Sequence, residues 1–173
     1  MSRKASELDW GREVSPHLKP DEWPEGVLDH LEARTVLTLS ELREDVKRPA
    51  FPSPVYGAHV RHRVRSPGAS NGDRHATDDD RRLSDATDFF VHWRDAQAYF
   101  RAIQRHPKIG GNGVYNRMML RGTPGDFCML HIDNRPERVN WVGDGREPVI
   151  YVMETAEPRT YFSLLAEMMG DAA

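Results

Sequence analysis

Residues 110–133 read GGNGVYNRMMLRGTPGDFCMLHID and supply two of the strands around which the chain folds. A glycine-rich lead ends in a short strand near Val114 and Tyr115, and a second strand covers Phe127–Asp133, which is largely apolar. His131 stands inside this apolar strand. A buried polar side chain is costly without a partner, so the strand predicts a polar contact or a ligand at His131.

The flanking sequence alternates helical and extended patterns. Pro49, Pro52 and Pro54 indicate an irregular connection, and Ser66–Arg82 is rich in turn residues and charge, which predicts a long surface loop. A strand is expected at His59–Arg65, with His59 and three arginines on one face. Apolar residues at spacings of three and four predict helices at Val27–Val46, Arg94–Arg105 and Pro158–Met169, and further strands are expected at Ala86–Trp93, Val139–Val142 and Val149–Met153.

This order of elements predicts an α+β fold, with a small, mainly antiparallel sheet and helices packed on one side. The first twenty residues carry scattered charge and two prolines, and they are interpreted as a loosely held N-terminal arm. Residues 21–173 are then expected to form a single domain, a size that can bury a substantial core.

Composition excludes several classes of function. Of 173 residues, 38% are hydrophobic and 29% charged, and the net charge of −3 lacks the cation excess of a general nucleic-acid binder. No apolar run is long enough to cross a bilayer, and the first residues are polar, so neither a membrane span nor a secretory signal is expected. Cys128 is the only cysteine, so a metal would have to be held by histidine and carboxylate.

Three residues stand out as candidate metal ligands. His75 lies in the charged loop, Asp88 near the start of an apolar strand and His131 inside another. Two histidines and one carboxylate, with a fourth position open, are a standard set for catalytic zinc. Spacing alone does not select these three from eight histidines and 27 acidic residues.

Four pieces of sequence occur in order: Arg65-Ser66-Pro67 with Asn71-Gly72, Arg74-His75 with Ala86-Thr87-Asp88, Gly110–Tyr115, and Leu130-His131-Ile132-Asp133. Together they resemble the zinc D-Ala-D-Ala carboxypeptidase family, to which peptidoglycan endopeptidases and many phage endolysins belong. The resemblance covers roughly residues 20–142 and includes the helix at 27–46 and Trp141. It implies a hedgehog-like D,D-peptidase architecture.

The resemblance implies that His75, Asp88 and His131 bind Zn²⁺ and that Arg65 lies near the scissile peptide or its carboxylate. Zinc would lower the pKa of water to about 7, and a carboxylate would move the proton to the leaving amine. Asp133 shares a strand face with His131 and is either that base or a residue that orients His131.

Two departures from the family pattern leave alternatives open. Twelve residues separate His75 from Asp88, more than the family usually has, so Asp78, Asp79 and Asp85 are rival ligands. Many members carry an acid three residues before the last histidine, where this chain has Cys128. Asp126 remains a further candidate base if the strand starts later than expected.

The sequence therefore predicts a metallopeptidase that hydrolyses stem or cross-bridge peptides of peptidoglycan, acting as a monomer with neither nucleic acid nor membrane as partner. The absent signal and small size suit a phage-encoded enzyme, made in the cytoplasm and released to the cell wall or carried in a virion. Two rival functions remain. One is a catalytically degenerate member that binds cell-wall peptide, and the other is a phage structural protein.

Overall fold

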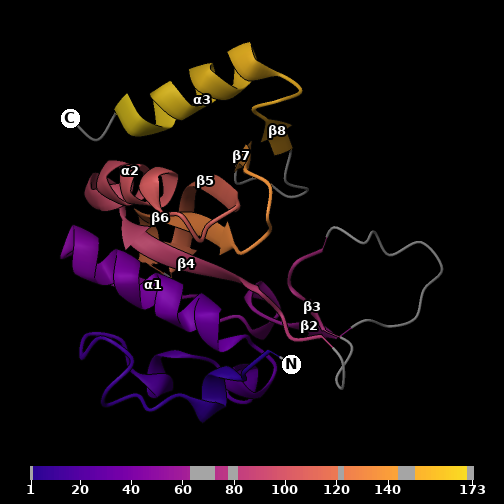
Figure 1. Cartoon of the computed structure of the whole chain (residues 1–173). Helices are drawn as coiled ribbons and strands as arrows, with labels where there is room; N and C mark the ends of the chain where they lie inside the picture. Colours follow the sequence, from indigo (N-terminus) through magenta and orange to yellow (C-terminus); the bar gives the residue numbers. More distant parts are fainter. Residues whose placement is uncertain (1, 63–72, 78–81, 121–122, 144–150, 171–173) are drawn as a thin grey trace.

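A mixed six-stranded sheet forms the centre of the computed structural model, which describes residues 2–62, 73–77, 82–120, 123–143 and 151–170 (Figure 1). The strand order is β1-β4-β6-β5-β7-β8, and every neighbouring pair is antiparallel except β5 and β7. The α+β class and the mainly antiparallel sheet are thereby confirmed. The strands are β1 Ala50–Pro52, β4 Ala86–His92, β5 Gly111–Leu120, β6 Thr123–Asp133, β7 Val139–Gly143 and β8 Tyr151–Met153.

Within the described residues, three α-helices accompany the sheet (Figure 1). They are α1 Ala33–Val46, α2 Ala96–Arg105 and α3 Pro158–Gly170. On the face that α2 covers, the ring of Phe89 packs edge-on against Tyr99 at 5.9 Å between centroids. Leu130, Val114 and Val142 continue this buried row across β6, β5 and β7. Short 3₁₀ turns are η1 Ala5–Glu7, η2 Pro20–Glu22, η3 Val27–Asp29, η4 Tyr56–Ala58 and η5 Trp93–Asp95.

The opposite face of the sheet carries the residues of functional interest. Side chains alternate along a strand, so the neighbours of the core residues point to this second face. Asp88, His131, Gly113 and Trp141 stand in register on β4, β6, β5 and β7 and form one row across it. A separate parallel pair, β2 Arg61–His62 and β3 Ala76–Thr77, carries residues of the segment that approaches this row.

The N-terminal segment is packed, in contrast to the loosely held arm expected from its charges. Ala5, Leu8, Val14 and Leu18 are buried in the hydrophobic core. The amide of Ala5 donates to the carbonyl of Leu31 at 2.9 Å. Apolar residues scattered among the charges therefore decide the position of this segment.

Helix α1 begins six residues later than expected. The stretch before it forms the 3₁₀ turn Val27–Asp29, with Gly26 in the left-handed region at φ 77°. Apolar periodicity runs through this turn, so the pattern alone extends the helix too far. The C-terminal end agrees with expectation, because Lys47 takes the left-handed conformation at φ 56° directly before Arg48-Pro49.

Two connections are more ordered than their composition indicates. Residues 50–52 form strand β1, which pairs with β4 at the sheet edge, where proline is tolerated. Within the expected surface loop, His75, Ala76 and Thr77 are buried, and the last two form β3. His59 is fully buried instead of lying on an exposed basic face, and positions 63–65 of that expected strand lie outside the described residues.

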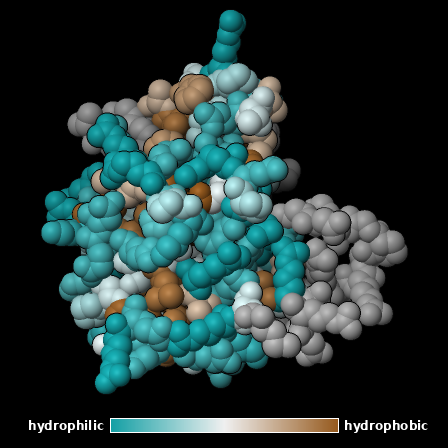
Figure 2. Space-filling model, in the orientation of Figure 1, coloured by the Kyte–Doolittle hydropathy of each residue, from teal (hydrophilic) through white to brown (hydrophobic). Residues whose placement is uncertain are grey.

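Polar side chains cover most of the face shown in Figure 2, and hydrophobic residues show only in small separate areas. Among the described residues, no helix combines the length and the apolar character needed to cross a membrane.

Candidate metal centre

Asp88 and His131 meet because they are direct partners on neighbouring antiparallel strands of the sheet. Opposed side chains on one face lie about 5 Å apart at Cβ, so short side chains can touch. His75 arrives from the segment before β3, where its backbone amide donates to the Asp73 carboxylate at 3.0 Å and its carbonyl accepts from the Arg61 amide at 2.8 Å. The sheet therefore fixes two of the three side chains, and the β2–β3 pair fixes the third.

The three side chains point their polar atoms at one another. Nδ1 of His131 lies 2.7 Å from Oδ1 of Asp88 and 3.2 Å from Nε2 of His75. The same Nε2 lies 3.6 Å from Oδ1 of Asp88. All three residues are buried, and one ligand atom from each lies within 4.8 Å of the others. This His75–Asp88–His131 group could hold a metal ion.

The second ring nitrogen of His131 is bonded to another carboxylate. Its Nε2 lies 3.2 Å from Oδ2 of Asp133. Asp133 in turn accepts hydrogen bonds from Arg135, whose Nε lies 2.8 Å from Oδ1. A histidine that donates one ring N–H to a carboxylate presents its other nitrogen as a ligand. The arrangement therefore assigns Nδ1 of His131 to the metal side and Nε2 to Asp133.

Electrostatics favour positive charge between Asp88 and Asp133, and a metal would have to displace the proton that His131 carries there. Burial opposes charge on His131, but hydrogen bonds and attraction from Asp133 and Asp88 outweigh burial and raise the pKa of His131 to about 9. Burial also opposes charge on Asp88, yet His75 and His131 keep the pKa of Asp88 below its ordinary value. Burial lowers the pKa of His75 to about 4 and leaves it neutral, as a ligand must be.

Two glycines on β5 make room for these side chains. A Cβ at Gly111 would stand 2.1 Å from the carboxylate of Asp133, and one at Gly113 would stand 2.5 Å from the indole of Trp141. The indole therefore lies across β5, with its ring centroid 4.9 Å from that of His131. Any side chain at Gly113 would push Trp141 away from His131.

Trp141 is itself held on two sides. Its Nε1 donates to the hydroxyl of Tyr115 at 3.2 Å, and the guanidinium of Arg135 stands 5.5 Å from the ring centroid. Arg135 thus contacts both Asp133 and the indole that packs on His131. Sequence reasoning missed Arg135, and it treated the glycines only as part of a glycine-rich strand. The alternate spacing of Gly111 and Gly113 was the available signal, since it clears one strand face.

The rival ligand Asp85 forms ion pairs with two arginines. Its carboxylate is bound by Arg74 and lies 3.4 Å from Nη2 of Arg34. Asp85 does not join the candidate ligand group. Asp78, Asp79 and the expected catalytic Arg65 lie outside the described residues.

The position where the sequence resemblance leads one to expect an acid faces away from the centre. Cys128 alternates with His131 on β6 and is buried on the helix-covered face, where its Sγ lies 3.2 Å from the carbonyl oxygen of Tyr115. Burial raises the pKa of this thiol to about 12, so it is neutral and unreactive. Asp126 is exposed and lies five residues before His131.

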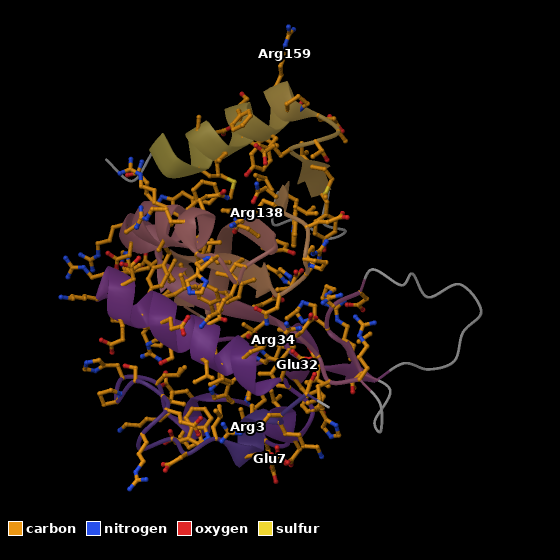
Figure 3. All side chains as sticks on the ribbon, in the orientation of Figure 1. Arg3, Glu7, Glu32, Arg34, Arg138 and Arg159 are labelled. Atoms are coloured by element: carbon orange, nitrogen blue, oxygen red, sulfur yellow. The ribbon has the colours of Figure 1, made fainter. Side chains whose placement is uncertain are left out.

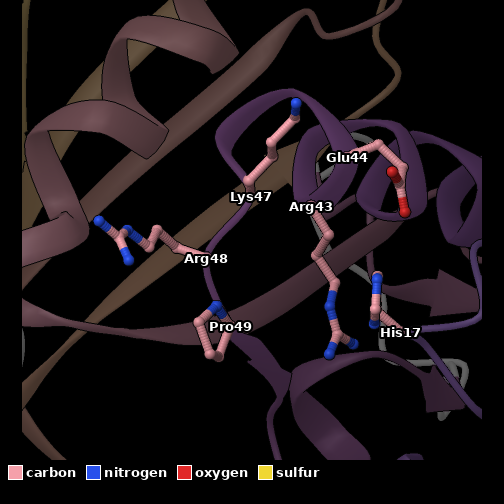
Figure 4. A pocket seen from close by; sticks show the side chains of 6 residues that line it. All are labelled: His17, Arg43, Glu44, Lys47, Arg48 and Pro49. Carbon is pink, nitrogen blue, oxygen red and sulfur yellow. The ribbon is translucent and has the colours of Figure 1, made fainter.

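A cavity of 480 Å³ at the end of α1 lies apart from the ligand group. It is lined by His17, Arg43, Glu44, Lys47, Arg48 and Pro49 (Figure 4). The side chain of Arg43 is 9% exposed and pairs with Glu22 at 3.1 Å, and Glu44 accepts a hydrogen bond from Ser15. Arg48, in turn, lies 3.8 Å from Asp95. None of the three candidate ligands lines the cavity.

Comparisons with family models, curated proteins and solved structures find no match to this chain. The fold and the ligand group therefore rest on the geometry described above.

Proposed function

We propose that this chain is a zinc-dependent peptidase that hydrolyses peptidoglycan stem or cross-bridge peptides, with the hedgehog-like architecture of the D-Ala-D-Ala carboxypeptidase type. One observation carries the proposal: His75, Asp88 and His131, selected from the sequence by resemblance to that family, converge in a buried group of metal-ligand geometry.

The donor set fits zinc. Two imidazole nitrogens and one carboxylate are a set that leaves a fourth position for water or substrate. When bound, zinc supplies a Lewis acid that polarises a peptide carbonyl and makes water a nucleophile near neutral pH. The buried carboxylate of Asp88 carries a negative charge. It attracts a divalent cation more strongly in the protein interior than it would in water.

The surrounding residues hold this donor set in place. Asp133 accepts a hydrogen bond from Nε2 of His131 and so turns Nδ1 toward Asp88 and His75, and Arg135 fixes the carboxylate of Asp133. With two partners, Asp133 suits the orienting role better than the role of base. Trp141 packs on His131 and shields one side of the centre from water.

A second function is favoured by the carboxylates around the centre. Asp133 and Asp85 are both engaged by arginines, and Cys128 replaces the acid of many relatives. These observations favour a degenerate member that binds zinc and a cell-wall peptide without cutting it.

Metal analysis of the purified protein tests both functions. We expect about one zinc per chain, lost in His131→Ala and retained in His106→Ala, whose histidine pairs with Glu41 at 3.0 Å outside the ligand group. Zinc together with release of peptides from peptidoglycan would support the peptidase. Zinc without release would favour the binding protein, and protein that takes up no zinc when offered it would remove both.

A further inference from the structure

Another cavity lies where β4 ends and β1 and β6 pair with it. Its volume of 420 Å³ falls within the range of about 300–1,000 Å³ that is usual for small-molecule sites. We call it the aromatic cavity, and none of the three candidate metal ligands lines it. The described residues that line it include Arg48, Phe51, His92, Arg94, Asp95 and Phe127.

Strand pairing places the aromatic cavity in line with the metal centre. Asp88 and His131 are direct partners on β4 and β6, and His92 and Phe127 are direct partners four residues away along the same strands. Side chains alternate along a strand, so all four side chains point to one face of the sheet. At about 3.3 Å per residue, the two pairs lie about 13 Å apart. The cavity and the metal centre therefore share one face of the sheet.

Apolar side chains separate the metal centre from the cavity. Phe90 and Met129 are partners midway between the two pairs, and Phe90 also pairs with Phe51 of β1. Among the described residues, Phe90 and Met129 belong neither to the hydrophobic core nor to the side chains packed against it. The strip of β4 and β6 between the two sites therefore carries no charge on this face.

Two phenyl rings and one imidazole form a wall of the cavity. The ring centroid of Phe127 lies 6.1 Å from that of Phe51 and 5.9 Å from that of His92. All three residues are only partly buried. Covering an exposed aromatic ring contributes strongly to binding, so this wall suits a ligand with a flat apolar surface.

Charged groups surround this wall. Nε of Arg48 lies 3.8 Å from Oδ1 of Asp95, and the backbone amide of Arg94 donates to Nδ1 of His92 at 3.3 Å. Both arginines are exposed, the side chain of Arg48 by 65%. Guanidinium groups donate several hydrogen bonds and carboxylates accept several. The cavity thus offers donors and an acceptor around an apolar wall.

We propose that the aromatic cavity binds an N-acetylated sugar ring of the glycan strand that carries the stem peptide. A sugar ring has apolar C–H faces, which suit the phenyl rings, and hydroxyl groups around its edge, which suit the arginines and Asp95. A small inorganic ion would leave the rings unused, and an aliphatic chain would leave the polar groups without partners. The choice of this sugar rests on the proposed function, whereas the binding itself requires neither zinc nor cleavage.

The spacing also orients the substrate. A distance of about 13 Å is spanned by about four extended residues. A stem peptide whose sugar occupies the aromatic cavity would therefore reach the metal centre along β6. The cavity would then select peptides that are still attached to glycan over free peptides.

The test measures binding of N,N′-diacetylchitobiose, an N-acetylated disaccharide without peptide, by NMR titration of the full chain. Phe127→Leu removes a ring of the cavity but keeps an apolar side chain, and Arg94→Gln removes an exposed charge. The matched controls are Phe162→Leu, whose ring on α3 is 53% exposed, and Arg159→Gln, whose side chain projects from α3 into solvent (Figure 3). Neither control residue lines the cavity.

We expect saturable binding by the wild type and both controls, with a Kd about three- to tenfold weaker in Phe127→Leu and about threefold weaker in Arg94→Gln. No saturable binding by the wild type would overturn the proposal. So would an unchanged Kd in Phe127→Leu or, should its spectrum show an unfolded chain, in Arg94→Gln, because the sugar would then lie elsewhere.

Repeating the titration with zinc-free and zinc-loaded protein separates this proposal from the proposed function. We expect the Kd for the sugar to be the same in both. Sugar binding without release of peptides from peptidoglycan would count against the peptidase alone. Release of peptides without sugar binding would count against the sugar site alone.

Discussion

Replacing Gly113 with alanine is expected to weaken the metal centre although Gly113 is not a ligand. The added Cβ would lie 2.5 Å from Cε2 and Nε1 of Trp141 and 2.8 Å from Cζ2. Carbon atoms pack at about 3.5 Å, so the indole must move by about 1 Å. It cannot do so freely, because Tyr115 and Arg135 hold it on two sides. The ring would therefore leave its contact with His131.

The magnitude follows from two opposing terms. Overpacking costs about 1–3 kcal/mol, whereas replacing glycine by alanine in a strand returns about 0.5–1 kcal/mol. We expect a net loss of about 1–2 kcal/mol in the free energy of unfolding, which lowers Tm by roughly 3–6 °C in a chain of this size. Zinc affinity should fall by about tenfold, the lower end for groups that support a metal ligand.

Thermal unfolding and zinc titration measure the two effects. Gly57→Ala is the matched control, because a Cβ at Gly57 meets nothing within 4 Å. In a Trp141→Leu background, Gly113→Ala should cost less than about 0.5 kcal/mol, since the clash is gone. If Gly113→Ala matches Gly57→Ala in Tm and zinc affinity, the proposed role of the glycine is refuted.

Three further outcomes are expected. Asp133→Asn should keep the fold but weaken zinc binding by about 10–100-fold, because it alters the partner of His131; equal affinity by calorimetry would contradict this. Burial lowers the pKa of His59, whose ring nitrogens bond to Thr87 and Ser53. As the pH falls, the unfolded chain therefore takes up a proton at His59 before the folded chain does. Stability should fall below about pH 6.5, and urea unfolding should show a smaller pH dependence in His59→Gln. Cys128 should react with a thiol reagent only after denaturation, as absorbance would show.

Much of the fold is predictable because periodicity records which face is buried. The strands around Phe89 and Leu130 and helix α2 lie where their apolar patterns place them. Short elements were missed for a physical reason: β1 and β3 have three and two residues and are formed by pairing with distant partners. A window of sequence does not contain those partners.

The candidate site, too, could be predicted from the sequence only in part. His75, Asp88 and His131 were selected by resemblance. Asp88 meets His131 through the register of β4 with β6, and His75 is brought to them by the β2–β3 pair, neither of which a local pattern specifies. The role of Gly113 depends on Trp141 in another strand, and Arg135 depends on the buried carboxylate of Asp133. Such relations appear only once the sheet is assembled.

The register that joins Asp88 to His131 also bears on how the protein folds. These residues are 43 positions apart, and His75 is 56 positions from His131, so the three segments meet only after long loops close. Any cation held there would cross-link them and stabilise the native state by mass action. Metal binding would then be coupled to folding, because the full ligand group exists only once β4 and β6 are paired in register.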